Sequence, residues 1–233
     1  MRVALLVALT GCGRLGFTAL DDTDAALDSP VALISCVGTA VCYRFDGDTL
    51  DSSGNGNHTQ ASSTTFAPSP DGQALVLVAG RSVSAPESSS LIIADVLTIE
   101  AVVRVDALPA VGMRGVIEDH DSSYILWVPP TGAVASALHL DGAAYSQSTA
   151  PNVVQVGTWH RLAATYDGTV HALYVDRVAV AAKAASGAIT PDSAAGLRIG
   201  SNSPDALNQN SDPFIGAIDS LRVWHRVLAA SEL

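Results

Sequence analysis

The feature that most constrains this chain is a long series of short strand-like runs separated by tight-turn signals. In residues 98–105 (TIEAVVRV) apolar and polar side chains alternate, with Val102 as the one exception. A period of two is typical of a β-strand with one buried face. Asp-Gly pairs at 141–142 and 167–168 stand between β-rich runs, where a type I′ turn requires positive φ at both central residues. The pattern therefore predicts antiparallel hairpins.

The remaining runs extend this pattern along the chain: GRSVSA, RGVIED, YILWV, GLRIG and AIDSLRVW. Only the end of the chain, RVLAASEL (226–233), favours one or two helical turns. No fixed-period repeat is present, which argues against a propeller or solenoid. Many short strands with almost no helix predict an all-β fold, a two-sheet antiparallel sandwich with a short C-terminal helical turn.

The N-terminus has the layout of a secretion signal. Arg2 supplies a charge, and residues 3–9 form an apolar run that is too short to span a bilayer as a mature helix. The ending Leu-Thr-Gly-Cys resembles a bacterial lipobox, after which Cys12 would carry lipid and become the mature N-terminus. The alternative is an ordinary apolar N-terminus with a chance cysteine.

The sequence divides into three parts on this interpretation. We expect residues 1–11 to be a lipoprotein signal peptide and residues 12–35, with four aspartates and no clear period, to be an acidic tether. Residues 36–233 would form the folded domain. We expect the product to be anchored by lipid in a bacterial envelope, in the outer membrane in preference to the inner.

Export would free the other two cysteines to pair. Cys36 and Cys42 bracket CVGTAVC, and in an oxidising compartment such thiols are better explained by a disulfide than by a redox pair. Two cysteines without a nearby histidine make a poor zinc site. The alternative is two buried thiols.

Residues 43–60 (YRFDGDTLDSSGNGNHTQ) are rich in oxygen-bearing side chains and glycine. Calcium prefers six to eight oxygen ligands, and Asp46, Asp51 and Asn55 could supply some of them. The stretch is not an EF-hand, because Ser62 stands where that loop needs a bidentate Glu. The alternative is a solvated loop in which Asp and Asn cap turns, as they commonly do.

Five segments occur in a recognisable order: YRFDGDTLDSSGNGNHT, LTIEAVVRV, GTWHRLAATYDGTVHALYVD, GLRIG and FIGAIDSLRVWHRVLAASEL. Together, over about residues 41–233, they resemble the laminin-G-like, concanavalin A-like domain of bacterial secreted proteins. The resemblance implies a curved two-sheet jelly roll, often with bound calcium, that binds carbohydrate or protein. It also implies that calcium joins the first strand and its loop to the last strand, which would bring Asp219 next to Asp46 or Asp51.

Two positions depart from the resembled family. Val102 stands where the family usually has Trp, which would leave a smaller core residue or a flatter surface. Arg177 stands where it usually has Gly, and we expect this arginine to force the turn after Asp176 away from an Asp-Gly geometry.

A glycan-cleaving enzyme of this fold would need two carboxylic acids a short distance apart. In VIEDHDSSY, Glu118 is followed at once by Asp119, so the two would point to opposite faces of a strand. We interpret residues 118–121 (EDHD) as a polar turn between strands. The sequence has no HExxH pair, no G-x-S-x-G elbow and no phosphate-binding glycine loop. We therefore expect a protein that is not an enzyme.

Sugar-binding sandwiches use exposed aromatic rings as apolar platforms. Tyr124 and Trp127 lie three positions apart in YILWV, so they should face opposite ways and one should be exposed. Tyr145 is a further candidate, and packing is the alternative for each of these rings. The other aromatic residues considered match core positions of the resembled family: Trp159, Tyr166, Tyr174 and Trp224.

The expected function is a non-catalytic binding or adhesion module of an envelope lipoprotein, with carbohydrate as the favoured ligand and calcium as a structural ion. A structural or protein-binding module in an envelope complex is the first alternative, and a glycoside hydrolase the second. A net charge of −11 argues against a nucleic-acid partner.

Overall fold

The structure, a computed structural model, describes residues 35–60, 63–111, 115–120, 123–190, 196–202 and 212–233. The expected signal peptide, the lipidated Cys12 and almost all of the expected tether lie outside these residues. Among the described residues, no helix is long and apolar enough to cross a membrane.

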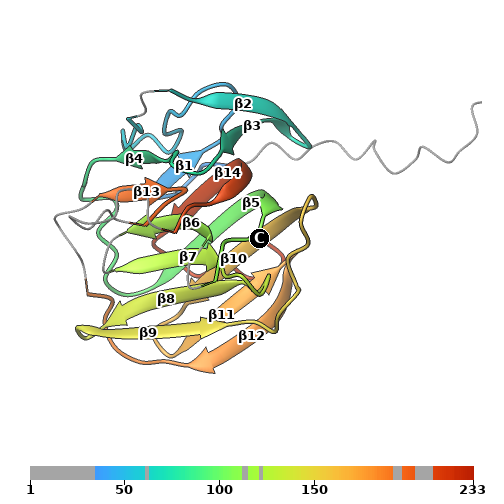
Figure 1. Cartoon of the computed structure of the whole chain (residues 1–233). Helices are drawn as coiled ribbons and strands as arrows, with labels where there is room; N and C mark the ends of the chain where they lie inside the picture. The colour runs from blue at the N-terminus through green and yellow to red at the C-terminus, as the bar shows by residue number, and fades with distance from the viewer. Residues whose placement is uncertain (1–34, 61–62, 112–114, 121–122, 191–195, 203–211) are drawn as a thin grey trace, which may run out of the picture. The chain divides into compact units, whose positions relative to one another are not determined.

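The larger sheet, sheet A, has eight antiparallel strands (Figure 1). Its strands are β1 (Val41–Tyr43), β2 (Thr65–Ser69), β3 (Gly72–Leu77), β5 (Leu97–Ala107), β10 (Trp159–Tyr166), β11 (Val170–Val175), β12 (Val178–Ala184) and β14 (Ile215–Trp224). They follow the order β12-β11-β10-β5-β14-β3-β2, and β1 also pairs with β14.

The smaller sheet, sheet B, has six antiparallel strands in the order β4-β13-β6-β7-β8-β9. They are β4 (Val83–Ala85), β6 (Gly115–His120), β7 (Tyr124–Val128), β8 (Ala135–Leu140), β9 (Ala143–Ser148) and β13 (Leu197–Ile199). One apolar core draws side chains from both sheets. The expected all-β jelly-roll sandwich is therefore confirmed.

Alternation in β5 decides which side chains enter that core. Ile99, Ala101 and Val103 belong to the core cluster, and each is essentially inaccessible to water. Burying an aliphatic side chain of this kind stabilises a fold by about 1.5–3 kcal/mol. Val102 lies on the opposite, outer face of sheet A across from Arg161 and is buried there, outside the main core.

The Asp-Gly hairpins are confirmed, but their turns differ. Asp141 and Gly142 have φ of 49° and 80°, both positive, as a type I′ turn requires. At the second hairpin only Gly168 has positive φ. There the Asp167 carboxylate accepts hydrogen bonds from the amides of Thr169 (2.8 Å) and Val170 (2.7 Å), which makes a longer loop.

The expectation for Arg177 was wrong. Asp176 and Arg177 have φ of 51° and 69°, so the turn between β11 and β12 keeps the left-handed geometry that an Asp-Gly pair would adopt. An L-residue with a side chain pays about 1–2 kcal/mol in that conformation. The surrounding sheet therefore imposes the turn in spite of the arginine.

The expected C-terminal helical turn is also corrected, since residues 225–233 contain bends and one hydrogen-bonded turn but no helix. Thr98 Oγ1 accepts a hydrogen bond from Leu228 N (3.0 Å) and donates one to Arg226 O (2.8 Å). The Glu232 carboxylate binds Ala229 N at 2.9 Å. These bonds occupy backbone groups that a helix would use.

The interpretation of EDHD as a turn was wrong for its first three residues. Glu118, Asp119 and His120 belong to β6 and pair with β13 on one side and β7 on the other. Pairing on both sides outweighs the turn preference of an isolated polar run. Asp121 lies outside the described residues.

Candidate functional site

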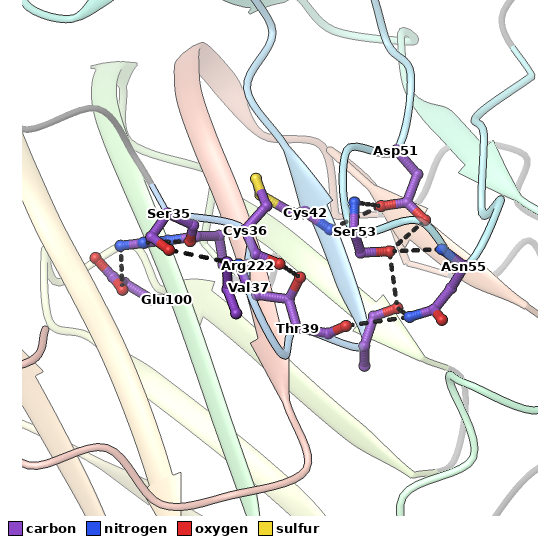
Figure 2. Close-up of a disulfide and its surroundings, with 11 residues drawn as sticks. Ser35, Cys36, Val37, Thr39, Cys42, Asp51, Ser53, Asn55, Glu100 and Arg222 are labelled. Carbon is purple, nitrogen blue, oxygen red and sulfur yellow. Dashed lines mark hydrogen bonds and ion pairs between the residues drawn. A yellow bond between two sulfur atoms is a disulfide. The ribbon is translucent and has the colours of Figure 1, made fainter.

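The polar stretch after β1 is organised around the buried carboxylate of Asp51. Its Oδ1 accepts hydrogen bonds from Cys42 N (3.0 Å) and Ser53 N (2.9 Å), as Figure 2 shows. Its Oδ2 accepts them from Ser53 Oγ (2.7 Å) and Asn57 N (2.9 Å). Four donors satisfy both oxygens, so Asp51 caps the loop.

Asn55 and the disulfide close the same loop. Asn55 Nδ2 donates to the carbonyls of Thr39 (3.1 Å) and Ala40 (2.9 Å) (Figure 2). Cys36 and Cys42 form the expected disulfide, with an S–S distance of 2.01 Å. These contacts join the start of the domain to the stretch that follows β1.

Asp219 has a different environment from Asp51. It is the extra residue of a β-bulge in β14, and it lies between the part of β14 that pairs with β3 and the part that pairs with β1. The residue is 1% exposed, and its Oδ2 has no hydrogen-bond partner. Such an atom is costly to bury in the ionised form.

Burial is the main cause that raises the pKa of Asp219 to about 6. Within that net shift, the nearby Ser69 hydroxyl acts to lower the pKa of Asp219, whereas the charges of Asp71 and Asp46 act to raise it. The Asp46 carboxylate lies directly against Gly72 and accepts a hydrogen bond from Gln73 N at 3.1 Å. The turn between β2 and β3 therefore brings Asp71 to this place, which sequence reasoning missed.

The aspartates of this region differ in how well their oxygens suit calcium. Within the described ranges, no three His, Cys, Asp or Glu side chains are grouped closely enough to hold a metal ion as they stand. The unpartnered oxygen of Asp219, with Asp46 and Asp71 nearby, fits the demand of a hard cation for carboxylate oxygen. Asp51 does not fit that demand, because protein donors already satisfy its oxygens.

The pair Tyr124 and Trp127 divides as expected, with one ring inside and one facing outward. Tyr124 is 1% exposed, donates to Leu91 O (3.2 Å) and stacks on His120 with 4.9 Å between ring centroids. It therefore offers no platform, which corrects its place among the candidates. Trp127 is half-buried on the outer face of sheet B.

Tyr145 lies at the rim of an open hollow between β9 and β12, the edge strands of the two sheets. Figure 1 shows these two strands at the bottom. The hollow has a volume of about 380 Å³. Its lining combines one aromatic ring, two hydroxyl groups and small apolar side chains: Tyr145, Thr169, Ala184, Ala185 and Ser186.

Contacts across the two edge strands fix the Tyr145 ring. Its hydroxyl donates to Ala184 O at 2.6 Å. The Nζ of Lys183 lies 4.4 Å from the ring centroid and 3.4 Å from Ser146 O. Lys183 is the only lysine of the chain, and no signal in the sequence assigned it to a site.

A buried histidine lies next to the Tyr145 ring. His171 lies 6.0 Å from Tyr145 between ring centroids, and its Nε2 lies 3.1 Å from Ser136 Oγ. Burial, and to a smaller extent the charge of Lys183, lowers the pKa of His171 to about 4. At neutral pH this histidine is uncharged, so Lys183 supplies the positive charge near the hollow.

Two other hollows are less suited to a sugar. One of about 210 Å³ beside β3 is lined by residues between Ser63 and Val83 and has no aromatic ring. The other, beside Ile125 and His139, has a volume of only about 60 Å³.

Three solved structures share the fold of this chain. The binding domain of Paraclostridial Mosquitocidal Protein 1 has a TM-score of 0.69 at 14% identity, over 84% of this chain and 50% of that one. Domain 4 of AbnA, a GH43 extracellular arabinanase from Geobacillus stearothermophilus in complex with arabinotriose, has a TM-score of 0.64 at 20% identity, over 83% and 95%. The CBM40 of the Ruminococcus gnavus IT-sialidase, bound to α2,3 sialyllactose, has a TM-score of 0.51 at 15% identity, over 67% and 97%.

This chain spans about half the length of the mosquitocidal binding domain and almost the whole of the other two. No curated protein matches the sequence. The family model of the concanavalin A-like lectin/glucanases superfamily matches residues 79–233, about two thirds of the chain. This chain belongs to the concanavalin A-like lectin/glucanases superfamily.

Proposed function

We propose that this chain is a non-catalytic carbohydrate-binding module whose binding site is the hollow at Tyr145. The fold supports this proposal, because the arabinanase domain and the CBM40 that share it are in complex with sugars. Fold alone does not assign function, so the proposal depends on the hollow.

The observation that carries the proposal is the fixed Tyr145 ring at the rim of an open hollow. A ring held by Ala184 O and by Lys183 loses little conformational entropy when a ligand packs against it. The Thr169 hydroxyl already donates to Asp167 Oδ1 (2.8 Å) and can accept from a sugar hydroxyl. The Ser186 hydroxyl and the ammonium of Lys183 provide donors for sugar oxygens. An aromatic surface with a few polar groups is typical of small-ligand sites.

The first experiment is a glycan array with the full chain, followed by isothermal titration calorimetry with the best ligand. Replacing Tyr145→Ala should weaken binding about fivefold or more, since aromatic contacts to a ligand are worth about 1 kcal/mol or more. Lys183→Ala should weaken it less. Trp127→Ala is the matched control, because it removes a larger ring from the outer face of sheet B and should leave affinity unchanged.

Two results would contradict this assignment. If Trp127→Ala abolishes binding and Tyr145→Ala does not, the site lies on the outer face of sheet B. If no glycan binds but a stable partner is recovered from envelope extracts, the chain is a protein-binding module.

We also propose that the domain is held at a bacterial envelope by lipid on Cys12, through the acidic residues 12–35. The order of charge, apolar run and small residues before Cys12 supports this placement. The Cys36–Cys42 disulfide supports export, because disulfides persist in oxidising compartments. Cys12→Ser should move the protein from the detergent phase to the aqueous phase on Triton X-114 partition, and an unchanged partition would reject the anchor.

Calcium belongs to the same proposal as a structural ion. Asp219 and Asp46, with Asp71, would hold it, and the ion would neutralise carboxylates whose charges repel one another near the bulge of β14. Asp51 and Asn55 would not bind the ion and would instead stabilise the loop after β1 through their hydrogen bonds.

A further inference from the structure

A buried ionic cluster lies on the outer face of sheet A. Glu100 is 1% exposed and accepts hydrogen bonds from Arg161 Nη1 and from Arg222 Nη2, the latter at 2.7 Å. Arg222 Nη1 also donates to Ser35 O at 3.2 Å (Figure 2). One carboxylate therefore serves two guanidinium groups, and the charges do not balance within this trio.

A third arginine adds to the excess. Arg177 is exposed and makes no hydrogen bond or ion pair with any described residue. Burial, and to a smaller extent the charge of Arg177, lowers the pKa of Arg222 to about 10. For Arg161, burial, then Arg222 and then Arg177 lower the pKa. The influences that the arginines exert on one another mean that the three positive charges repel.

Donor groups remain unused in this cluster. Arg222 Nε is buried and has no hydrogen-bond partner. Arg161 donates to Glu100 through Nη1, and its Nε and Nη2 donate to no described residue. The Arg161 side chain is about one fifth exposed, so part of it is accessible to a ligand.

The carboxylates around the cluster do not remove the excess. Asp176 is the nearest in sequence, but its Oδ1 accepts from Arg161 N (2.9 Å) and its Oδ2 lies 2.9 Å from His160 Nδ1. Asp71 and Asp219 raise the pKa of Arg161, yet they act more weakly than burial and the two arginines. Positive charge therefore remains at the exposed end of the cluster.

The backbone at Arg177 is strained as well. Its φ of 69° lies in the left-handed region, where a side chain is disfavoured and glycine is not. Strain of this kind concentrates at binding sites, where an observed outlier justifies a hypothesis of function. A bound anion would offset both the repulsion among the arginines and the cost of the turn.

We propose that Arg161 and Arg177, with Arg222 behind them, form a second binding site that takes the carboxylate group of an acidic sugar. Planar guanidinium groups bind carboxylates through two parallel hydrogen bonds. This geometry favours a carboxylate as the anion. The inference that the ligand is a sugar rests on the proposed function. The inference that the ligand carries a carboxylate rests on the arginines. The site lies at the β11–β12 turn, at the opposite end of β12 from Lys183.

Isothermal titration calorimetry of the full chain with trigalacturonate tests the proposal, with the methyl ester of the same sugar as the uncharged control. Wild type should bind the acid and not the ester, and its affinity should fall as NaCl is added. Arg177→Gly should weaken binding at least tenfold and raise the melting temperature, because glycine relieves the turn. Arg81→Ala removes the same charge from an exposed residue elsewhere and should leave affinity unchanged.

The outcomes separate this site from the hollow at Tyr145. Equal binding of the ester, or full affinity in Arg177→Gly, would overturn the carboxylate site. An aspartate-rich peptide that binds in place of trigalacturonate would overturn the assignment to a sugar. If Tyr145→Ala loses a neutral glycan and keeps trigalacturonate, the two sites are independent, as proposed. If the acid fails to bind while the neutral glycan still binds, only the second site is rejected.

Discussion

Replacing Asp219→Asn should change how the stability of the domain depends on pH. The pKa of this carboxyl is 3.8 when unperturbed and about 6 in the fold, mainly because of burial. A carboxyl with a raised folded pKa stabilises the fold below its unfolded pKa, and that contribution is lost as pH rises through the folded pKa. The relevant window is therefore between about pH 4 and pH 7.

The magnitude follows from the same two values. At 1.36 kcal/mol for each pKa unit, the difference corresponds to about 2–3 kcal/mol between the ends of the window. Asparagine keeps the shape of the side chain and cannot ionise. The stability of wild type minus that of the variant should therefore be highest near pH 4 and fall by this amount by pH 7. For a domain of this size the fall corresponds to roughly 4–12 °C in melting temperature.

Urea denaturation in EDTA, at half-unit steps from pH 4 to pH 8, measures this difference directly. Asp51→Asn is the matched control, since hydrogen-bond donors satisfy that carboxylate, and it should be destabilising across the whole range. A flat difference curve for Asp219→Asn would refute the idea of an uncompensated buried carboxyl. With calcium present, the wild-type loss near pH 7 should shrink while the variant is unchanged, and an identical curve in calcium and in EDTA would reject the proposed metal site.

Three further variants test the other contacts. Replacing Cys36→Ser and Cys42→Ser together should cost about 2 kcal/mol in urea denaturation, from the closed-loop entropy of a short loop, and an unchanged midpoint would contradict this. Glu100→Gln should cost about 3 kcal/mol, because it leaves Arg161 and Arg222 without their shared carboxylate; a neutral effect by the same assay would show that the arginines are solvated. Gly196→Ala should prevent folding or lower the melting temperature by more than 5 °C, since φ is +67° and a Cβ would collide with the Ala85 carbonyl. Circular dichroism distinguishes these outcomes.

The fold was predictable because its signals are local. Alternation in residues 98–105 assigns one face of β5 to the core, and the Asp-Gly pair at 141–142 specifies a type I′ turn. The disulfide between Cys36 and Cys42 also joins residues that are close in sequence. Each of these signals needs only a few neighbouring residues to be read.

Local signals fail where distant groups impose the conformation. Arg177 adopts a glycine-like turn because the β11–β12 pairing fixes it. The C-terminal residues avoid a helix because Thr98, 130 positions from Leu228, binds their backbone. The hollow at Tyr145 depends on Ala184, 39 positions away on the other sheet. No periodicity or motif in the sequence predicts these long-range contacts.

Asp51 and Asp219 show why the metal site in particular could not be chosen from the sequence. Both are aspartates, both are almost completely buried, and both were candidates for the same ion. Their difference lies in the donors that reach them: four donors satisfy Asp51, whereas one oxygen of Asp219 has no partner at a bulge near two other carboxylates. A carboxylate that is already satisfied would lose hydrogen bonds by binding a cation, while an unsatisfied one would gain by it. The sequence shows which residues could be metal ligands. The hydrogen-bond donors around each carboxylate decide whether binding a cation would stabilise it.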